Sequence, residues 1–451
     1  MFVERGKGPA DAADADAPSP EVHVCFYNST TRRDFKRENN PPEPEKSPKT
    51  MRFCPCFFPK TMYNIPQDFQ YRLFFKKTPH PLTRAAMLYY LVSLVSDFED
   101  TPLRLFNYFT FRAAAALVTA TLLGILLGPL TVRLLKQAVA PPRLEGIVDE
   151  KYVDHSKDKT PSMGGILVVA SIILATLLWG DLTNRLLLLF LCTLTAFSAI
   201  GFIDDFTKIK SKKDGVSAKY KLVCQFAVSL MAILVYSHLT PEIAKSFRQL
   251  YVPFIKDPVW TMPYPLAVAF AVFVLVGTSN AVNLTDGKDG LATGCTIWCM
   301  MTYGLIAYLC TNSIFASHLD LPFIRNGAEI VVFAAAIIGA CVGFLWHNCK
   351  PASMFMGDTG SLALGGIIGF ISILVNQELL LILVGGVFVM EIGSVIIQVS
   401  SFKLTGKRVF KCTPIHHHFE QLGWTETQIV TRFWILAGLF ALAGAATMKL
   451  R

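Results

Sequence analysis

Long apolar runs recur from residue 111 to the C-terminal region of this 451-residue chain, and shorter polar segments separate them. Runs of this length cross the ~30 Å hydrocarbon layer of a bilayer when they fold as α-helices. The fold predicted from this pattern is an all-α polytopic membrane protein with about ten transmembrane helices. The expected spans are 111–135, 162–179, 185–203, 220–238, 264–282, 291–311, 328–346, 360–376, 379–401 and 428–448.

Residues 1–86 differ from the rest of the chain. They begin with a stretch rich in Ala, Asp and Pro and contain no long apolar run. Such a composition cannot bury enough apolar surface to order a chain, so it favours a disordered N-terminal extension. Because Met51, Met62 and Met87 are alternative start positions, a misassigned start is the other interpretation. Residues 87–451 are expected to form the integral membrane domain.

Composition supports the membrane assignment. Hydrophobic residues make up 52% of the chain and charged residues only 17%, whereas a soluble protein carries about 25% charged residues. The net charge of +9 is explained by loop lysines that face anionic lipid headgroups and an anionic substrate, without nucleic acid. None of the eleven cysteines belongs to a pair with zinc-site spacing, and we assign them no function.

The charges of the loops predict an orientation. Five polar loops, 136–161, 204–219, 283–290, 347–359 and 402–427, fall on one side of the membrane if the spans alternate in direction. Outside the N-terminal region, we count 17 basic residues at this side and seven at the other. Cytoplasmic loops are enriched in Lys and Arg. The five loops and the active site are therefore expected in the cytoplasm, with both termini in the periplasm.

Clusters of carboxylates occur where apolar runs end. Asp204 and Asp205 close the third run, Asp286 and Asp289 follow the fifth, and Asp358 precedes the eighth. Ionised carboxylates at a membrane boundary are costly and repel one another, so they require a cation or a function. Hard oxygen donors favour Mg²⁺, and the clusters predict a metal site that serves a phosphorylated substrate. Taken singly, each motif also has a structural explanation: Asp204–Asp205 as interfacial charges, Asn283–Gly290 as a polar turn and Asp358 as a helix cap.

Basic and hydroxyl side chains near these carboxylates are candidates for binding phosphate. Lys157, Lys159 and Ser162 lie before the second span, and Lys208 lies beyond the aspartate pair. The alternative for each lysine is an ordinary positive-inside residue. The carboxylate of Glu391 lies inside the ninth span, where it is a functional candidate by default or forms a hydrogen bond that kinks the helix.

Three consecutive histidines, His416, His417 and His418, lie in the last polar loop. Neighbouring residues rarely converge on one ion, and no Cys or HExxH partner accompanies them. Imidazoles that line a pyrophosphate site are a better interpretation. Since three adjacent side chains point in different directions, we expect only one or two of them to reach the site.

Together these motifs resemble the phospho-N-acetylmuramoyl-pentapeptide transferases, the MraY branch of the polyprenyl-phosphate N-acetylhexosamine-1-phosphate transferase superfamily. The resemblance covers about 87–451. The carboxylate motifs are shared across that superfamily, whereas the string Pro-Ile-His-His-His-Phe-Glu is specific to the MraY branch. The motifs that carry the resemblance are Lys159–Gly165, Asp204–Asp205, Asn283–Gly290, Phe355–Ser361 and Pro414–Glu420.

The resemblance implies transfer of phospho-MurNAc-pentapeptide from its UDP derivative to undecaprenyl phosphate in the bacterial cytoplasmic membrane. The products would be lipid I and UMP, and Mg²⁺ would be required. The implied partners are these two substrates and membrane lipids, with no nucleic acid, and a homodimer is left open.

The resemblance also implies roles for individual residues. Asp358 would bind Mg²⁺ together with Asp286, and Asp204 or Asp205 would deprotonate the lipid phosphate. The three histidines would hold the pyrophosphate or assemble the site. Direct attack by the lipid phosphate and a covalent aspartyl intermediate stay open as alternatives. The substrate pocket would be lined by Lys157, Lys159, Ser162, Lys208, Asn283, Asp289, Asn348 and Phe355, with Asn348 and Phe355 against the uridine.

Two other functions are compatible with part of the pattern. A WecA-type enzyme would transfer GlcNAc-1-phosphate to the same lipid and would use the same carboxylate motifs. A transporter with gating carboxylates would require polar residues deep within several spans, and only Glu391 satisfies that requirement. The sequence therefore favours the transferase.

Overall fold

The computed structural model describes residues 102–138, 160–211, 215–325 and 327–448. These residues belong to one compact unit, His80–Arg451. The expected extension, 1–86, lies outside the described residues, and so do Lys157 and Lys159.

The described part of the chain is almost entirely helical. A two-stranded antiparallel ribbon, β1 (Gln249–Leu250) and β2 (Trp260–Thr261), pairs Gln249 with Thr261. The helices are η3 (Pro102–Asn107), α3 (Phe109–Ala138), α4 (Gly165–Trp179), α5 (Arg185–Ser211), α6 (Ala218–Ser237), α7 (Pro241–Ser246), α8 (Tyr264–Thr285), α9 (Leu291–Thr311), α10 (Ser313–His318), α11 (Ala328–Asn348), α12 (Asp358–Leu374), α13 (Leu381–Val384), α14 (Gly386–Thr405), α15 (Ile415–Gln421) and α16 (Glu426–Thr447).

Each predicted span coincides with helix, so the all-α class is confirmed. In the described residues, eight helices are long and apolar enough to cross a membrane: α3, α5, α6, α8, α9, α11, α14 and α16. The second and eighth predicted spans correspond to the shorter apolar helices α4 and α12. Large apolar side chains also face outward, for example Leu126 on α3 at 70% exposure and Met231 on α6 at 66%. An apolar exterior of this kind suits a multi-pass protein in lipid.

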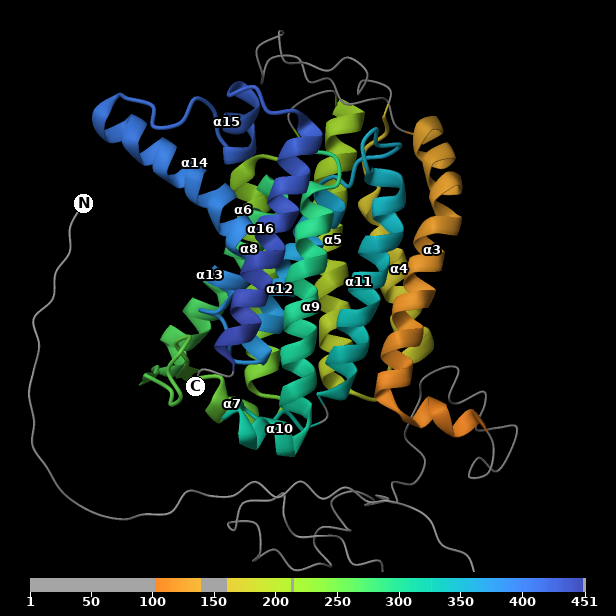
Figure 1. The fold of residues 1–451 in the computed structure, drawn as a ribbon, viewed down its shortest axis with the longest axis vertical. Helices are drawn as coiled ribbons and strands as arrows, with labels where there is room; N and C mark the ends of the chain where they lie inside the picture. The colour runs from red at the N-terminus through yellow and green to blue at the C-terminus, as the bar shows by residue number, and fades with distance from the viewer. Residues whose placement is uncertain (1–101, 139–159, 212–214, 326, 449–451) are drawn as a thin grey trace, which may run out of the picture. The chain divides into compact units, whose positions relative to one another are not determined.

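The ninth predicted span, 379–401, is wrong as a single helix. The chain forms a short helix, α13, and then a separate one, α14, with the break at Gly385. At the break, Gly386 packs so closely on α16 that a β-carbon there would lie 2.6 Å from the ring of Phe440. Beyond it α14 leans away from the other helices (Figure 1). Hydropathy did not predict the break because both pieces are apolar.

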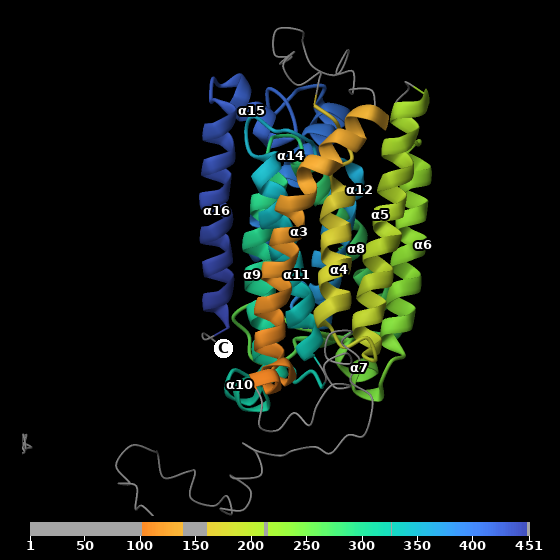
Figure 2. The same cartoon turned by 90° about the vertical axis from the view of Figure 1, so that its right-hand side faces the viewer.

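Helix α12 occupies the interior of the bundle. Every residue from Thr359 to Leu374 is buried, and the helix packs against α4, α5, α8 and α9. Figures 1 and 2 show these helices around it, with α6 and α16 at opposite edges in Figure 2. Its first residue, Asp358, therefore lies at the end of the bundle where α5 and α8 also end and where α15 lies (Figure 1).

A buried ion pair joins three helices at the opposite end of the bundle. Arg112 of α3 bonds to Glu329 of α11 at 2.6 and 3.0 Å, and it also donates to the carbonyl of Trp179 at the end of α4. The two side chains are only 12% and 6% exposed. Removing one partner leaves the other charge buried without compensation.

We expect Arg112→Ala to lower the free energy of unfolding by about 3 kcal/mol, the scale for breaking a buried pair. Thermal unfolding of the detergent-solubilised protein measures it, with Arg185→Ala as the control because Arg185 is exposed at the same end of the bundle. Equal midpoints for the two variants would mean that the pair contributes nothing to stability.

Candidate active site

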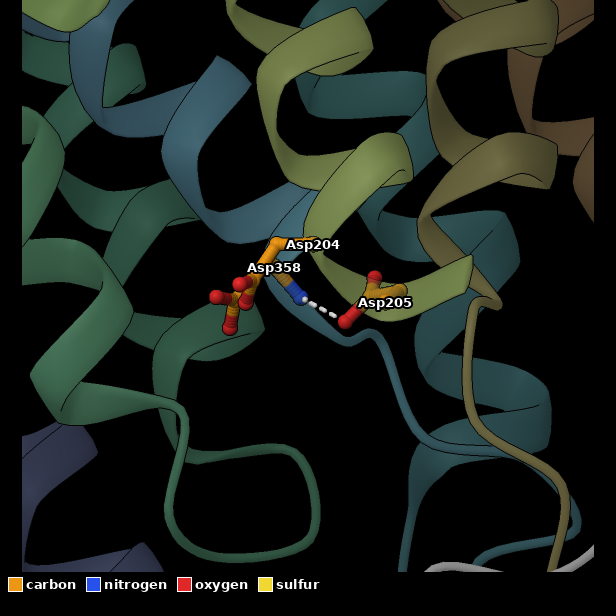
Figure 3. A group of neighbouring side chains, drawn as sticks. All are labelled: Asp204, Asp205 and Asp358. Carbon is orange, nitrogen blue, oxygen red and sulfur yellow. Dashed lines mark hydrogen bonds between the residues drawn. The ribbon is translucent and has the colours of Figure 1, made fainter. Parts of the chain in front are cut away.

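Three carboxylates meet at the start of α12. Asp204 and Asp205 come from α5 and Asp358 from α12, and oxygen atoms from all three lie within 4.8 Å of one another. Figure 3 shows Asp204 and Asp358 with their carboxylates side by side, whereas Asp205 lies on the other side of the α12 backbone. The carboxylates that follow the third predicted span and the one that precedes the eighth thus lie at one place in the fold.

Close packing of α5 on α12 brings the carboxylates together. A β-carbon at Gly201, one turn before Asp205, would lie only 2.2 Å from the carbonyl oxygen of Asp358. No other residue type fits there, because its side chain would overlap the backbone of α12. The α5 backbone therefore lies directly on the first turn of the central helix.

Asp205 caps the N-terminus of α12. It accepts hydrogen bonds from the amides of Asp358 (3.2 Å) and Thr359 (2.9 Å) and from the Thr359 hydroxyl (2.7 Å). The first amides of a helix have no acceptor within the helix, and a carboxylate there also interacts favourably with the helix dipole. Asp205 therefore holds Asp358 in place.

Asp204 has a different environment. Its carboxylate accepts from the amide of Val216 (2.9 Å) and pairs with Lys208 (2.7 Å) and Lys221 (3.3 Å). The expectation that the helix ends at the aspartate pair is wrong, since α5 continues to Ser211. That extra length places Lys208 one turn after Asp204, where residues four apart share a face.

Two ammonium groups offset the charge of the carboxylates. Lys208 and Lys221 lie 3.3 and 2.7 Å from the same oxygen of Asp358. Lys208 was a sequence candidate, whereas Lys221 was assigned only to the positive-inside count. Its position in the first turn of α6, immediately after the loop that follows the aspartate pair, was the available signal.

Helix α8 contributes the next groups. Asn283 donates from Nδ2 to Asp358 (2.8 Å) and to the hydroxyl of Ser361 (2.9 Å), so it fixes the carboxylate from the side opposite to α5. Burial, with Asp358 and Asp205 close by, raises the pKa of Asp286 well above its ordinary value. Asp286 is not one of the three carboxylates that approach within 4.8 Å of one another, although the charges of Asp358 and Asp205 contribute to its raised pKa.

The donor set fits a hard divalent cation. Carboxylate oxygens are the ligands that Mg²⁺ prefers, and Mg²⁺ is held by one or two carboxylates when a substrate phosphate completes its shell. The three carboxylates could hold such an ion. Asp358 is the best placed of them, because Asp205 is engaged by backbone amides and Asp204 by the amide of Val216. In this structure, the ammonium groups of Lys208 and Lys221 balance the charge of these carboxylates.

Two further candidates, Asp289 and Asn348, form hydrogen bonds that join separate loops and helices. Asp289 accepts from the amide of Ala352, and its own amide donates to Glu426. Asn348 is 2% exposed and bonds to Gly290, Thr293 and Met354. This arrangement argues against the predicted uridine contact of Asn348, because its amide group is already engaged inside the protein.

Phe355 and Ser162 lie where two loops meet. The amide of Phe355 donates to Pro161, and its carbonyl accepts from Gly164. The hydroxyl of Ser162 lies 3.0 Å from where a β-carbon at Gly357 would be, beside Asp205. Ser162 therefore lies next to the carboxylate cluster, and the backbone of Phe355 joins the two loops two residues before Gly357.

The three histidines diverge, as expected for consecutive residues. His416 is buried and bonds through Nδ1 to Glu391 at 3.1 Å. His417 bonds to Glu420 (3.0 Å), and this bond together with nearby Lys288 lowers the pKa of Glu420 to about 2. His418 accepts from the amide of Lys411. His416 is the one that faces the loop after α8, where its ring touches Gly287.

Comparison with known proteins agrees with this site. Residues 187–376, which include both halves of the carboxylate cluster, match the family described as glycosyl transferase family 4. The chain is 43% identical over 369 residues to a phospho-N-acetylmuramoyl-pentapeptide-transferase of Methylacidiphilum infernorum (isolate V4), which covers 81% of this chain and 100% of the relative. A protein of the same name from Koribacter versatilis (strain Ellin345) is 42% identical over 385 residues, 81% of this chain and 99% of the relative. The chain therefore belongs to the phospho-N-acetylmuramoyl-pentapeptide-transferase family.

Proposed function

We propose that this protein transfers phospho-MurNAc-pentapeptide from its UDP derivative to undecaprenyl phosphate, forming lipid I and UMP in a bacterial cytoplasmic membrane. The observation that carries the proposal is the cluster of three carboxylates and two lysines at one end of a bundle of apolar helices. A lipid phosphate and a soluble nucleotide meet only at the membrane surface, and both are anions. Family membership supplies the identity of the substrates.

The reaction is a displacement at phosphorus. An oxygen of the lipid phosphate forms a bond to the β-phosphorus of the nucleotide, and the bond from that phosphorus to the bridging oxygen breaks, so that UMP leaves with the electron pair. Asp204 accepts the remaining proton of the lipid phosphate before attack. Its carboxylate is held by Lys208, Lys221 and the amide of Val216, and it is not used to cap a helix.

The other residues bind, orient and neutralise. Lys208 and Lys221 offset the negative charge that gathers as the two substrates approach. Asp205 and Asn283 hold Asp358 from two sides. Ser162 and Phe355 are the candidates for the nucleotide, Phe355 by stacking on uracil. His416, which lies against Gly287, is the candidate for the pyrophosphate.

A magnesium ion bound by Asp358, with Asp204, Asp205 and Asp286 around it, would neutralise phosphate charge and act as a Lewis acid toward the phosphoryl oxygens. Asp204, Asp205 and Asp358 suit that role because they are oxygen donors gathered at one place, and such donors are the ligands that Mg²⁺ prefers.

The direct test is release of UMP from UDP-MurNAc-pentapeptide by the purified protein, with and without undecaprenyl phosphate. We expect UMP only when the lipid phosphate is present. UDP-GlcNAc in place of the muramyl nucleotide tests the WecA-type alternative, and release of UMP from UDP-GlcNAc alone would contradict the proposal.

We also infer that the carboxylate end of the bundle faces the cytoplasm and that both termini are periplasmic, from the excess of basic residues in the loops at that end. In right-side-out cells, a single cysteine introduced within 250–260 should react with a membrane-impermeant maleimide. A cysteine at Lys219, close to the aspartate pair, should be protected. The opposite labelling pattern would overturn the orientation.

A further inference from the structure

A further buried carboxylate, Glu391, lies near the site and is not one of the three clustered aspartates. Glu391, in α14, is 0% exposed, and His416, in α15, is 1% exposed. Nδ1 of His416 lies 3.1 Å from Oε2 of Glu391. A fully buried carboxylate is costly unless it is paired, so this contact must have a structural or functional reason.

The edge of the His416 ring that carries Nε2 points toward the loop after α8. Its Nε2 would lie 2.4 Å from a β-carbon at Gly287, so only a glycine leaves room for the ring. Gly287 directly follows Asp286 in the loop after α8. Within the described residues, Nε2 is buried and makes no hydrogen bond. A buried polar atom of this kind is unfavourable unless a ligand or solvent uses it.

The contact with Glu391 determines which nitrogen of the His416 ring carries the proton. A carboxylate at Nδ1 accepts the proton of Nδ1, which leaves Nε2 of a neutral imidazole as an acceptor with a fixed direction. Burial lowers the pKa of His416, which favours the neutral ring, and Glu391 acts in the opposite direction. The orientation of the ring is thus set from α14.

Helix α15 does not depend on this contact alone. Lys288 pairs with Glu420 of α15 at 2.7 Å, and Lys350 pairs with Glu426 at the start of α16. Loss of Glu391 should therefore free the His416 ring while the helix that carries it stays in place.

We propose that Glu391 is a positioning residue, which holds His416 in one orientation and one tautomer against the Asp286–Gly287 turn. It thereby connects α14, the helix that leaves the bundle, to the loop beside the carboxylate cluster. The proposal rests on the transferase activity proposed above and deepens it. It assigns Glu391 a role in positioning a residue of the site, whereas the alternative role, a hydrogen bond that kinks α14, would be structural only.

The test compares Glu391→Gln with Glu378→Gln. Glu378 is also a buried carboxylate, 6% exposed, but it lies after the far end of α12 from Asp358. We expect Glu391→Gln to lower kcat for UMP release at least about 10-fold, the lower scale for losing a carboxylate that orients a functional histidine, with KM for both substrates little changed. Glu378→Gln should keep a kcat close to that of the unmodified protein.

A double-mutant cycle separates positioning from general damage. If Glu391 acts through His416, then Glu391→Gln should cost nothing further in a His416→Gln background. Additive losses, an unchanged kcat, or a rise in KM with unchanged kcat would each overturn the proposal. An unmodified protein that releases no UMP would instead contradict the proposed function itself.

Glu391→Asp provides the second variant if Glu391→Gln is too unstable to purify. It keeps a carboxylate with a side chain one methylene shorter, so part of the contact with Nδ1 should survive. We expect it to retain more kcat than Glu391→Asn, which has the same length and no charge. Equal kcat values for the two variants would show that the carboxylate does not act on the histidine.

Discussion

Asp358→Asn should abolish turnover, with a fall in kcat of at least ~10³-fold, the scale for deleting a main electrostatic stabiliser. Asp358 is the residue on which the site converges: Lys208, Lys221 and Asn283 all contact its carboxylate. The amide of asparagine has the same shape but no charge, so it binds a divalent cation poorly and leaves Asp204 as the remaining carboxylate paired with both lysines. UMP release at saturating Mg²⁺ measures the effect.

Folding should survive this substitution because the start of α12 is capped from α5. Asp205 accepts the amides of residues 358 and 359 whatever side chain stands at position 358. The control is Asp320→Asn, which removes a half-buried aspartate paired with Lys256 in the loop after α10. A variant Asp358→Asn with near-normal turnover would show that Asp358 is only a helix cap.

Hydropathy predicted most of the fold because crossing a bilayer demands long apolar helices. Each of the ten runs corresponds to helix, and the eighth run became α12, the most enclosed helix of all. The break between α13 and α14 was missed because it is set by the contact of Gly386 with Phe440, which are 54 positions apart in the sequence. Run length and hydropathy contain no information about such a contact.

The sequence predicted which carboxylates form the candidate site, but not which partners each carboxylate contacts. Carboxylates at the ends of separate spans pointed to Asp204, Asp205 and Asp358, and the fold brings these three together. Sequence spacing could not show that Asp205 faces the amides of α12 while Asp204 faces two lysines. That division depends on the packing of Gly201 against Asp358, a feature of the tertiary structure.

For Lys221 and Glu391 as well, the sequence could not show the contact that the tertiary structure makes. Lys221 was indistinguishable from other loop lysines until α6 placed it against Asp358. Glu391 could have been a kink or a functional group, and only the position of α15 reveals His416 as its neighbour. A single sequence shows which charged residues are unfavourable to bury, but only the fold shows which group pairs with each of them.

Asp204→Asn and Asp205→Asn should both reduce turnover strongly, and they should differ in how pH and Mg²⁺ change the defect. If Asp204 deprotonates the lipid phosphate, its loss matters less at high pH, where the acceptor is already dianionic. The second pKa of a phosphate monoester is ~6, so the Asp204→Asn defect should shrink between roughly pH 6 and 9. Added Mg²⁺ should not restore activity.

Asp205→Asn should behave differently because Asp205 supports the start of α12. The carboxylate of Asp205 uses both oxygens to accept from two amides and a hydroxyl, and asparagine keeps only one of these oxygens and no charge. We therefore expect lower thermal stability, a defect that depends little on pH, and partial recovery with added Mg²⁺. Rates of UMP release for both variants across pH and Mg²⁺ concentration distinguish the two roles. If metal alone rescues both variants, neither aspartate is the base, and the proton of the lipid phosphate must be removed by another group or be lost before binding.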